Sequence, residues 1–94
     1  MKAEEKVILR EFEVLNKYGI HARPAALLVR TAGKFSCDIF IGQKGGEVSA
    51  KSIMGLLTIE GYQGVKLSVR FVGRDAEEAL TEISELFENK FFEE

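Results

Sequence analysis

The chain has 94 residues, of which 46% are hydrophobic and 30% charged, a balance that indicates one small globular domain and excludes a disordered segment. The formal net charge of -2 is unevenly divided: residues 1–74 hold 12 Lys and Arg against 7 Asp and Glu, whereas residues 75–94 hold one base and eight acids. The chain has no Lys/Arg cluster of the kind that indicates nucleic-acid binding. A core this small leaves no room for a large internal active site.

Compartment and redox state follow from the termini and the cysteine count. No apolar run approaches the roughly 18 residues of a membrane span, and residues 1–6 lack the apolar segment of a secretory signal. Cys37 is the only cysteine, which excludes a disulfide framework and a multi-cysteine metal site within one chain. We therefore expect a cytoplasmic protein without membrane insertion.

The first strand is predicted over residues 7–15. Phe12 and Val14 fall on one face of this segment, and Glu11 and Glu13 fall on the other, which is the period of two that a half-buried strand shows.

Residues 22–35 change to the helical period after a break at residues 16–19. Pro24 lies in the first turn of this predicted helix, where its missing N–H costs nothing. The apolar stripe of the helix consists of Ala25, Leu28, Val29, Ala32 and Phe35.

Two short strands follow at residues 37–41 and 47–50, and the glycines of residues 43–46 are typical of a hairpin turn between them. A short helix is predicted over residues 52–58, with Ser52 as its N-cap.

The clearest strand covers residues 65–71, and the last helix begins after Asp75. Asp75 with Glu78 resembles a capping box. The core stripe of the last helix consists of Ala76, Ala79, Leu80, Ile83 and Phe87. Its final turns are rich in Glu, the wrong sign for the C-terminal dipole, which indicates that fraying at residues 91–94 is tolerated.

Strands that are apolar on one face predict one sheet with a single covered face. The expected class is α+β, a βαββαβα open-faced two-layer sandwich with helices on one face, in a single domain of residues 1–94.

His21 is the only histidine and lies between a predicted strand end and a predicted helix start. A helix N-terminus offers free N–H groups and partial positive charge to an anion, and Arg23 adds a bidentate phosphate donor. A neutral imidazole is a nucleophile, so these groups favour reversible phosphoryl transfer.

A solvated or capping role for His21 is the plainer alternative. A metal site lacks a second His or Cys nearby, and no nucleophile elbow supports a hydrolase.

Four apolar residues stand within five positions of the short helix: Ile53, Met54, Leu56 and Leu57. One stripe of so short a helix cannot bury all of them, which favours an exposed patch where a partner docks. The alternative is that all four belong to the core. In either case a phosphate on Ser52 would be compatible with the helix dipole.

Two segments resemble a known family. Residues 16–26, NKYGIHARPAA, resemble the active-site segment of the histidine-containing phosphocarrier protein HPr family of the phosphoenolpyruvate-dependent sugar phosphotransferase system. Residues 51–55, KSIMG, resemble the regulatory serine segment of that family, and the separation of 31 residues between His21 and Ser52 is that of the family. The resemblance covers roughly residues 12–87.

The resemblance implies a stoichiometric phosphocarrier, not an enzyme, that needs no cofactor and acts as a monomer. Enzyme I would phosphorylate His21 on Nδ1, Arg23 would steady the phosphoryl group, and a downstream permease component would receive it. An HPr kinase/phosphorylase would modify Ser52. Partner docking would involve Ile53, Met54 and Leu57.

Three alternatives stay open. The chain could serve a regulatory, nitrogen-type phosphotransferase branch, or it could act as a co-regulator through phosphorylated Ser52. A small RNA-binding α+β domain is the third alternative, although the strands offer no exposed aromatic platforms. Tyr18, bulkier than the residue often found before this glycine, and the tail at residues 91–94 depart from the family pattern.

Overall fold

The computed structural model describes residues 5–93, and its elements follow the predicted order. The elements are β1 (Val7–Glu13), α1 (Ala22–Ala32), β2 (Asp38–Gln43), β3 (Gly46–Ser49), α2 (Ile53–Leu56), β4 (Lys66–Val72), α3 (Ala76–Glu88) and a short 3-10 turn at Lys90–Phe92.

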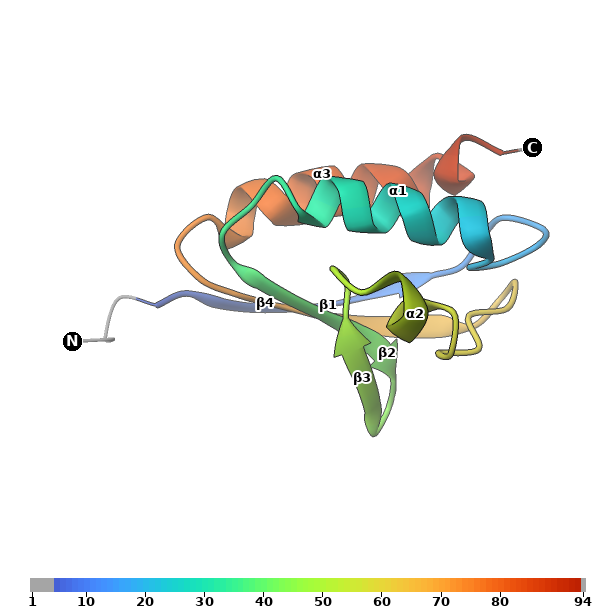
Figure 1. Cartoon of the computed structure of the whole chain (residues 1–94), viewed down its shortest axis with the longest axis horizontal. Coiled ribbons are helices and arrows are strands. Elements are labelled where there is room, and N and C mark those ends of the chain that lie inside the picture. Colours follow the sequence, from blue (N-terminus) through green and yellow to red (C-terminus); the bar gives the residue numbers. More distant parts are fainter. Residues whose placement is uncertain (1–4, 94) are drawn as a thin grey trace.

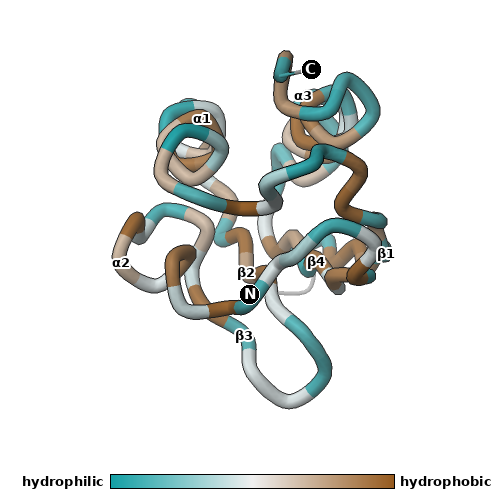
Figure 2. The backbone as a smooth tube through the Cα atoms, turned by 90° about the vertical axis from the view of Figure 1, so that its right-hand side faces the viewer, coloured by the Kyte–Doolittle hydropathy of each residue, from teal (hydrophilic) through white to brown (hydrophobic). Residues whose placement is uncertain are grey.

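The four strands form one antiparallel sheet in the order β1-β4-β2-β3. Helices α1 and α3 lie side by side over one face of the sheet, and α2 lies beside β3 (Figure 1). Figure 2 shows the same two layers after a turn of 90°, with the strands beneath the helix pair. The predicted open-faced α+β sandwich is therefore confirmed.

The core lies between the sheet and the helix pair. Leu67, Val69 and Phe71 of β4 are fully buried there, as their alternation with polar residues predicts. Phe12 of β1 stacks on Phe87 of α3, with ring centroids 4.8 Å apart. These contacts fix α3 over the β1 edge of the sheet, because offset-stacked rings add specific geometry to apolar burial.

Helix α1 is shorter than predicted. It ends at Ala32, where the Gly33 N–H donates to the carbonyl oxygen of Val29 at 2.9 Å and the Lys34 N–H donates to that of Thr31 at 3.1 Å. Phe35 lies beyond the helix and is half-buried against the core.

The capping box expected at the start of α3 is absent. Asp75 occupies the N-cap position but makes no side-chain cap. Its carboxylate instead accepts hydrogen bonds from the backbone N–H groups of Ser36 and Cys37, both at 2.9 Å. The Ser36 N–H is the main reason why the pKa of Asp75 lies below its ordinary value. Asp75 therefore ties the loop after α1 to the start of α3.

The described part of the tail is packed against the protein, although the charges before it would tolerate fraying. Phe91 is buried against the edge of the Phe87 ring, with centroids 5.0 Å apart, and Glu93 is hydrogen-bonded to other segments. Apolar burial of Phe91 outweighs the unfavourable charges at the end of α3. Glu94 lies outside the described residues.

The uncovered sheet face carries a charged and aromatic cluster. The guanidinium of Arg70 lies 4.4 Å from the ring centroid of Phe40 and makes two hydrogen bonds to Glu47, at 2.8 and 3.1 Å. Phe40, the aromatic residue of this face within the described strands, is thus covered by a cation.

Cys37 is expected to be chemically inert in the native protein. Burial, followed by the neighbouring Asp75 carboxylate, raises the pKa of its thiol to about 11. At pH 8 about one thiol in a thousand is then ionised, and only the thiolate reacts. We expect a disulfide reagent to label native protein very slowly and guanidinium-unfolded protein at once. Rapid labelling of the native protein would contradict this burial.

Candidate functional site

His21 is positioned by a close approach of two loops. Gly19 has a φ of +67°, and a Cβ atom on it would lie 2.3 Å from the carbonyl oxygen of Gly61. This contact requires a glycine, both for the backbone conformation and for the space. The next residue, Ile20, is buried and donates its N–H to the same Gly61 oxygen at 2.8 Å. The loop that precedes α1 is therefore held in place, and it fixes the backbone position of His21.

His21 itself is the N-cap residue of α1, with extended backbone angles, and its side chain does not cap the helix. The imidazole is directed to the C-terminal tail: its Nε2 lies 2.9 Å from Oε2 of Glu93. Among residues 5–93, no group is hydrogen-bonded to Nδ1. The side chain of His21 is 41% exposed, and the ring of Tyr18 stands edge-on to it at 6.2 Å. The site is thus a half-exposed surface group.

Asn16 and Glu93 belong to this site, although the sequence did not indicate either. The fully buried Nδ2 of Asn16 donates to the carbonyl oxygen of Gly19 at 2.8 Å and to Oε1 of Glu93 at 3.0 Å. Two acceptors face this nitrogen, which fixes the amide orientation. An Asn at the end of a strand signals only a turn, and nothing in the sequence brings position 93 to position 21.

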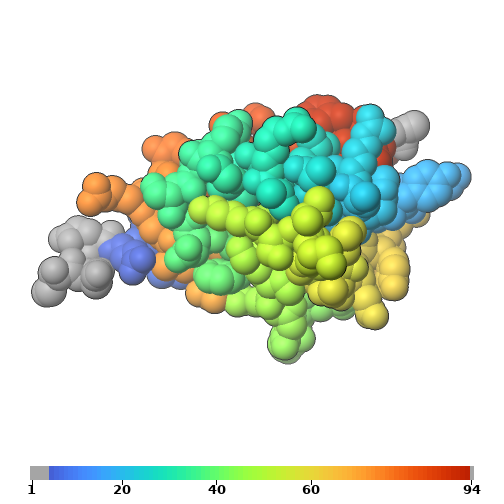
Figure 3. All heavy atoms as spheres, in the orientation of Figure 1, coloured from blue at the N-terminus to red at the C-terminus, as the bar shows by residue number. Residues whose placement is uncertain are grey.

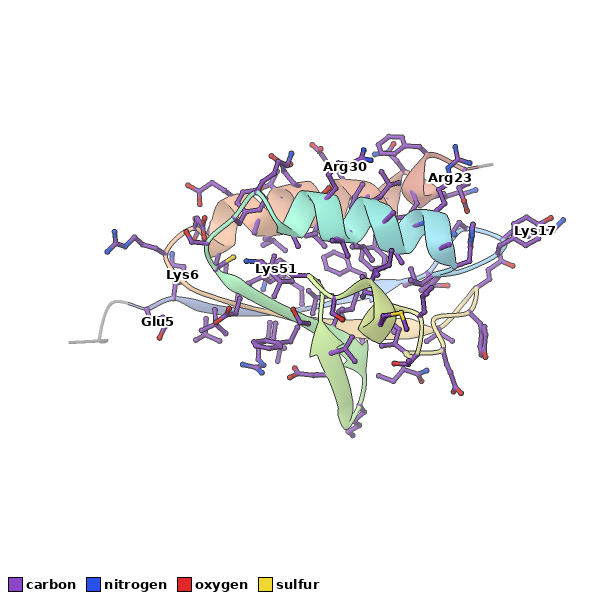
Figure 4. The ribbon with its side chains drawn as sticks, viewed as in Figure 1. Glu5, Lys6, Lys17, Arg23, Arg30 and Lys51 are labelled. Atoms are coloured by element: carbon purple, nitrogen blue, oxygen red, sulfur yellow. The ribbon has the colours of Figure 1, made fainter. Side chains whose placement is uncertain are left out.

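Arg23 lies exposed in the first turn of α1, two residues after His21. Figure 4 places Arg23 at the N-terminal end of the helix and Lys17 at the tip of the preceding loop, at the same end of the molecule. The structure therefore has His21 and Arg23 at the start of a helix, as predicted, with Lys17 at the same end of the molecule.

Ser52 is the N-cap of α2, as predicted, and its Oγ accepts the N–H of Gly55 at 3.1 Å. A Cβ on Gly55 would lie 3.1 Å from Cβ of Val48, so the glycine lets α2 pack closely on β3. Ser52 is partly accessible, and within residues 5–93 no hydrogen bond joins it to His21, although α1 and α2 contact each other.

The four apolar residues of the α2 segment divide between core and surface. Leu56 is fully buried, whereas Ile53, Met54 and Leu57 are 40%, 72% and 47% exposed. We call these three exposed residues the apolar patch. Figure 3 shows the α2 segment at the molecular surface against α1. The alternative that all four belong to the core is thus wrong for three of them.

Two kinds of feature are absent from the described part of the chain. Over residues 5–93 no three His, Cys, Asp or Glu side chains gather as metal ligands would. Within the same range no helix has the length and hydropathy to cross a membrane.

Comparison with known proteins identifies the family of this chain. A family model described as "PTS HPr component phosphorylation site" matches residues 8–89. The chain belongs to the HPr family. The phosphocarrier protein HPr of Xylella fastidiosa is 46% identical over 84 residues, which cover 89% of this chain and 94% of the relative.

Solved HPr structures have the same fold. The crystal structure of HPr-C-His from Thermoanaerobacter tengcongensis superimposes with a TM-score of 0.88 at 44% identity, covering 93% of this chain and 98% of that one. An HPr dimer from the same organism has a TM-score of 0.70 at 45% identity, covering 84% and 91% of the two chains. The HPr-like protein Crh of Bacillus subtilis is 38% identical over 83% of this chain and 92% of its own.

Proposed function

We propose that this HPr-family protein accepts a phosphoryl group from phosphorylated Enzyme I on His21 and passes it to a downstream permease component of the phosphotransferase system. It acts stoichiometrically, as a carrier and not as a turnover enzyme. The proposed setting is the cytoplasm. One chain carries a complete site, so a monomer is sufficient, although a related HPr also crystallises as a dimer.

The observation that carries this proposal is the placement of the only histidine at the N-cap of α1 with a half-exposed ring. The eleven-residue helix directs its free N–H groups and the positive end of its dipole to an anion at this place. A phosphoryl group on Nδ1 would lie beside these donors. Phosphoryl transfer needs such positioning and electrostatic support more than covalent help from the protein.

Arg23 is proposed to steady the phosphoryl group. Its guanidinium is a planar donor that can bind two phosphate oxygens at once, which the point charge of a lysine cannot do. Its exposed position in the first turn of α1 lets it approach a group on His21 without displacing any core residue.

The apolar patch is proposed as the docking surface for Enzyme I and the downstream acceptor. Met54 is the most exposed of the three residues, and an unbranched thioether adapts to more than one partner surface. Ser52 stands directly before the patch, so a phosphate placed there by an HPr kinase/phosphorylase would alter docking.

A mainly regulatory role is the second candidate, either in a nitrogen-type branch or as a co-regulator bound through phosphorylated Ser52. The similarity to Crh favours keeping this candidate. The RNA-binding alternative is weakened because Arg70 covers Phe40 and leaves no free stacking platform at this place.

Replacing the histidine tests the carrier function. We expect His21→Ala to abolish acceptance of labelled phosphate from phosphoenolpyruvate and Enzyme I, because no second histidine can substitute. The circular dichroism spectrum should stay unchanged, since the ring is half-exposed and is not part of the buried core. Label on the wild-type protein should be lost in acid, as a phosphohistidine is. Acid-labile labelling of His21→Ala would disprove the assignment.

A charge within the apolar patch tests docking. Met54→Glu should raise the KM for Enzyme I several-fold, because the partner would have to desolvate a carboxylate. Unfolding free energy should change by no more than about 0.5 kcal/mol, as for other exposed sites. The matched control is Leu9→Glu, an equal change at an exposed leucine of β1. Equal KM values for the two variants would contradict docking at α2.

Phosphorylation of Ser52 should slow phosphoryl transfer to His21 without unfolding α2. The phosphate adds about -1.5 to -2 charge at the N-cap, where the dipole favours it. We expect a raised KM for Enzyme I, an unchanged circular dichroism spectrum and partial relief at high salt. The enzymatically modified protein is compared with Ser52→Ala. Unaltered transfer kinetics after modification would show that the two sites are uncoupled.

A further inference from the structure

Glu93 accepts the one hydrogen bond that the imidazole of His21 makes within residues 5–93. The Glu93 side chain is 13% exposed, against 41% for His21, so the carboxylate is the better fixed partner of the two. We propose that Glu93 is a positioning residue for phosphoryl transfer at His21. Its carboxylate holds the Nε2 proton, orients the ring and leaves the lone pair of Nδ1 for the phosphoryl group. This inference rests on the carrier function proposed above.

The proton assignment follows from the chemistry of the pair. An ionised carboxylate can only accept hydrogen bonds, so Nε2 must be the donor to Oε2 of Glu93. In the neutral imidazole one nitrogen carries the proton and the other carries the lone pair. The contact with Glu93 therefore selects the tautomer in which Nδ1 is the nucleophile. The same logic operates where a carboxylate orients a metal-binding histidine through its second nitrogen.

The contact grows stronger during the reaction. The Nδ1 lone pair forms the new N–P bond, the bond from phosphorus to the donor breaks, and its electron pair leaves with the donor. The ring thereby gains one positive charge, which it shares between Nδ1 and the Nε2–H group. Glu93 faces that charge at 2.9 Å and keeps the proton on Nε2 throughout. An interaction that strengthens as charge develops lowers the barrier and does not merely tighten binding.

Repulsion between Glu93 and the phosphoryl group is the opposing effect. The two ring nitrogens point away from each other, so the phosphoryl group and the carboxylate lie at different edges of the ring. The attraction acts across one hydrogen bond and the repulsion across the ring, and Coulomb energy falls with distance. The start of α1 and Arg23 further offset the phosphoryl charge.

Glu93 is held in place by groups that do not react. Its Oε1 accepts from the buried Asn16, and its N–H donates to the carbonyl oxygen of Lys90 at 3.0 Å. Lys90, Phe91 and Phe92 all have φ values between +54° and +59°, a left-handed turn that L-residues adopt at a cost. Burial of Phe91 against Phe87 compensates for this cost and fixes the direction of the tail.

The segment that delivers the carboxylate begins at Lys90, whereas the family model matches residues 8–89. The family match therefore does not by itself assign a role to Glu93.

The first experiment records the ring ¹⁵N chemical shifts of His21 with the imidazole in its neutral form, and needs no partner protein. Wild-type protein should show the Nε2–H tautomer almost alone, whereas Glu93→Ala should show a mixture. The control is Glu88→Gln, which removes one exposed carboxylate from the end of α3. Identical ring shifts in wild type and Glu93→Ala would overturn the proposal.

The second experiment measures phosphoryl transfer from phosphorylated Enzyme I to the same proteins. Loss of an orienting partner of this kind costs about tenfold or more, so we expect Glu93→Ala to lower kcat on the order of tenfold with KM nearly unchanged. Glu93→Gln, which keeps the size but not the charge, should be intermediate. Equal rates for wild type and both Glu93 variants, or an equal loss in Glu88→Gln, would overturn the proposal.

The two hypotheses fail in different ways. If wild-type protein accepts no phosphate on His21, the carrier function is wrong. If wild-type protein accepts it and Glu93→Ala accepts it equally fast, only the role of Glu93 is wrong. Thermal unfolding of Glu93→Ala checks that the fold survives, and Phe91→Ala, which removes the anchor of the tail, should reproduce the tautomer mixture with Glu93 still present.

Discussion

The buried amide of Asn16 is the interaction on which the site depends. Its Nδ2 joins the carbonyl oxygen of Gly19 to the carboxylate of Glu93, so one side chain connects the loop before α1 with the chain end. Its Oδ1 has no hydrogen-bond partner, and such a buried acceptor costs roughly 1–3 kcal/mol. The two bonds from Nδ2 offset this cost, and they bring the tail to the imidazole.

The architecture explains why His21 and the apolar patch lie on the surface. A sheet covered on one face buries a continuous core beneath α1 and α3, and the loops that meet at Gly19 and Gly61 carry His21 to the rim. Beside it, α2 buries Leu56 and exposes the apolar patch. The proposed transfer of a phosphoryl group between proteins would need this arrangement, because a deep pocket would exclude the partner's reacting group.

Local patterns predicted most of the fold because they report which face of each element is buried. The alternation around Val69 determined the central strand, and the spacing of Ala25, Leu28 and Ala32 determined the buried face of α1. Ser52 acts as the predicted cap because capping needs only neighbours within one turn. Asp75 shows the limit: its local pattern predicts a cap, but the N–H groups of the Ser36–Cys37 loop compete for the carboxylate. Sequence spacing contains no information on such a competitor.

The sequence by itself determined the sandwich, the family resemblance and the placement of His21 and Arg23 at a helix start, because all of these depend on residue type and short spacing. Only the tertiary structure decided how the end of the chain packs and where it leads. The local charges around Glu88 would tolerate fraying, yet Phe91 packs into a core whose shape is set by Phe12 and Phe87, far apart in sequence. The burial of that one ring directs Glu93 to His21. Local sequence could not predict this contact, because its two residues are 72 positions apart and meet only through the packing of the layers.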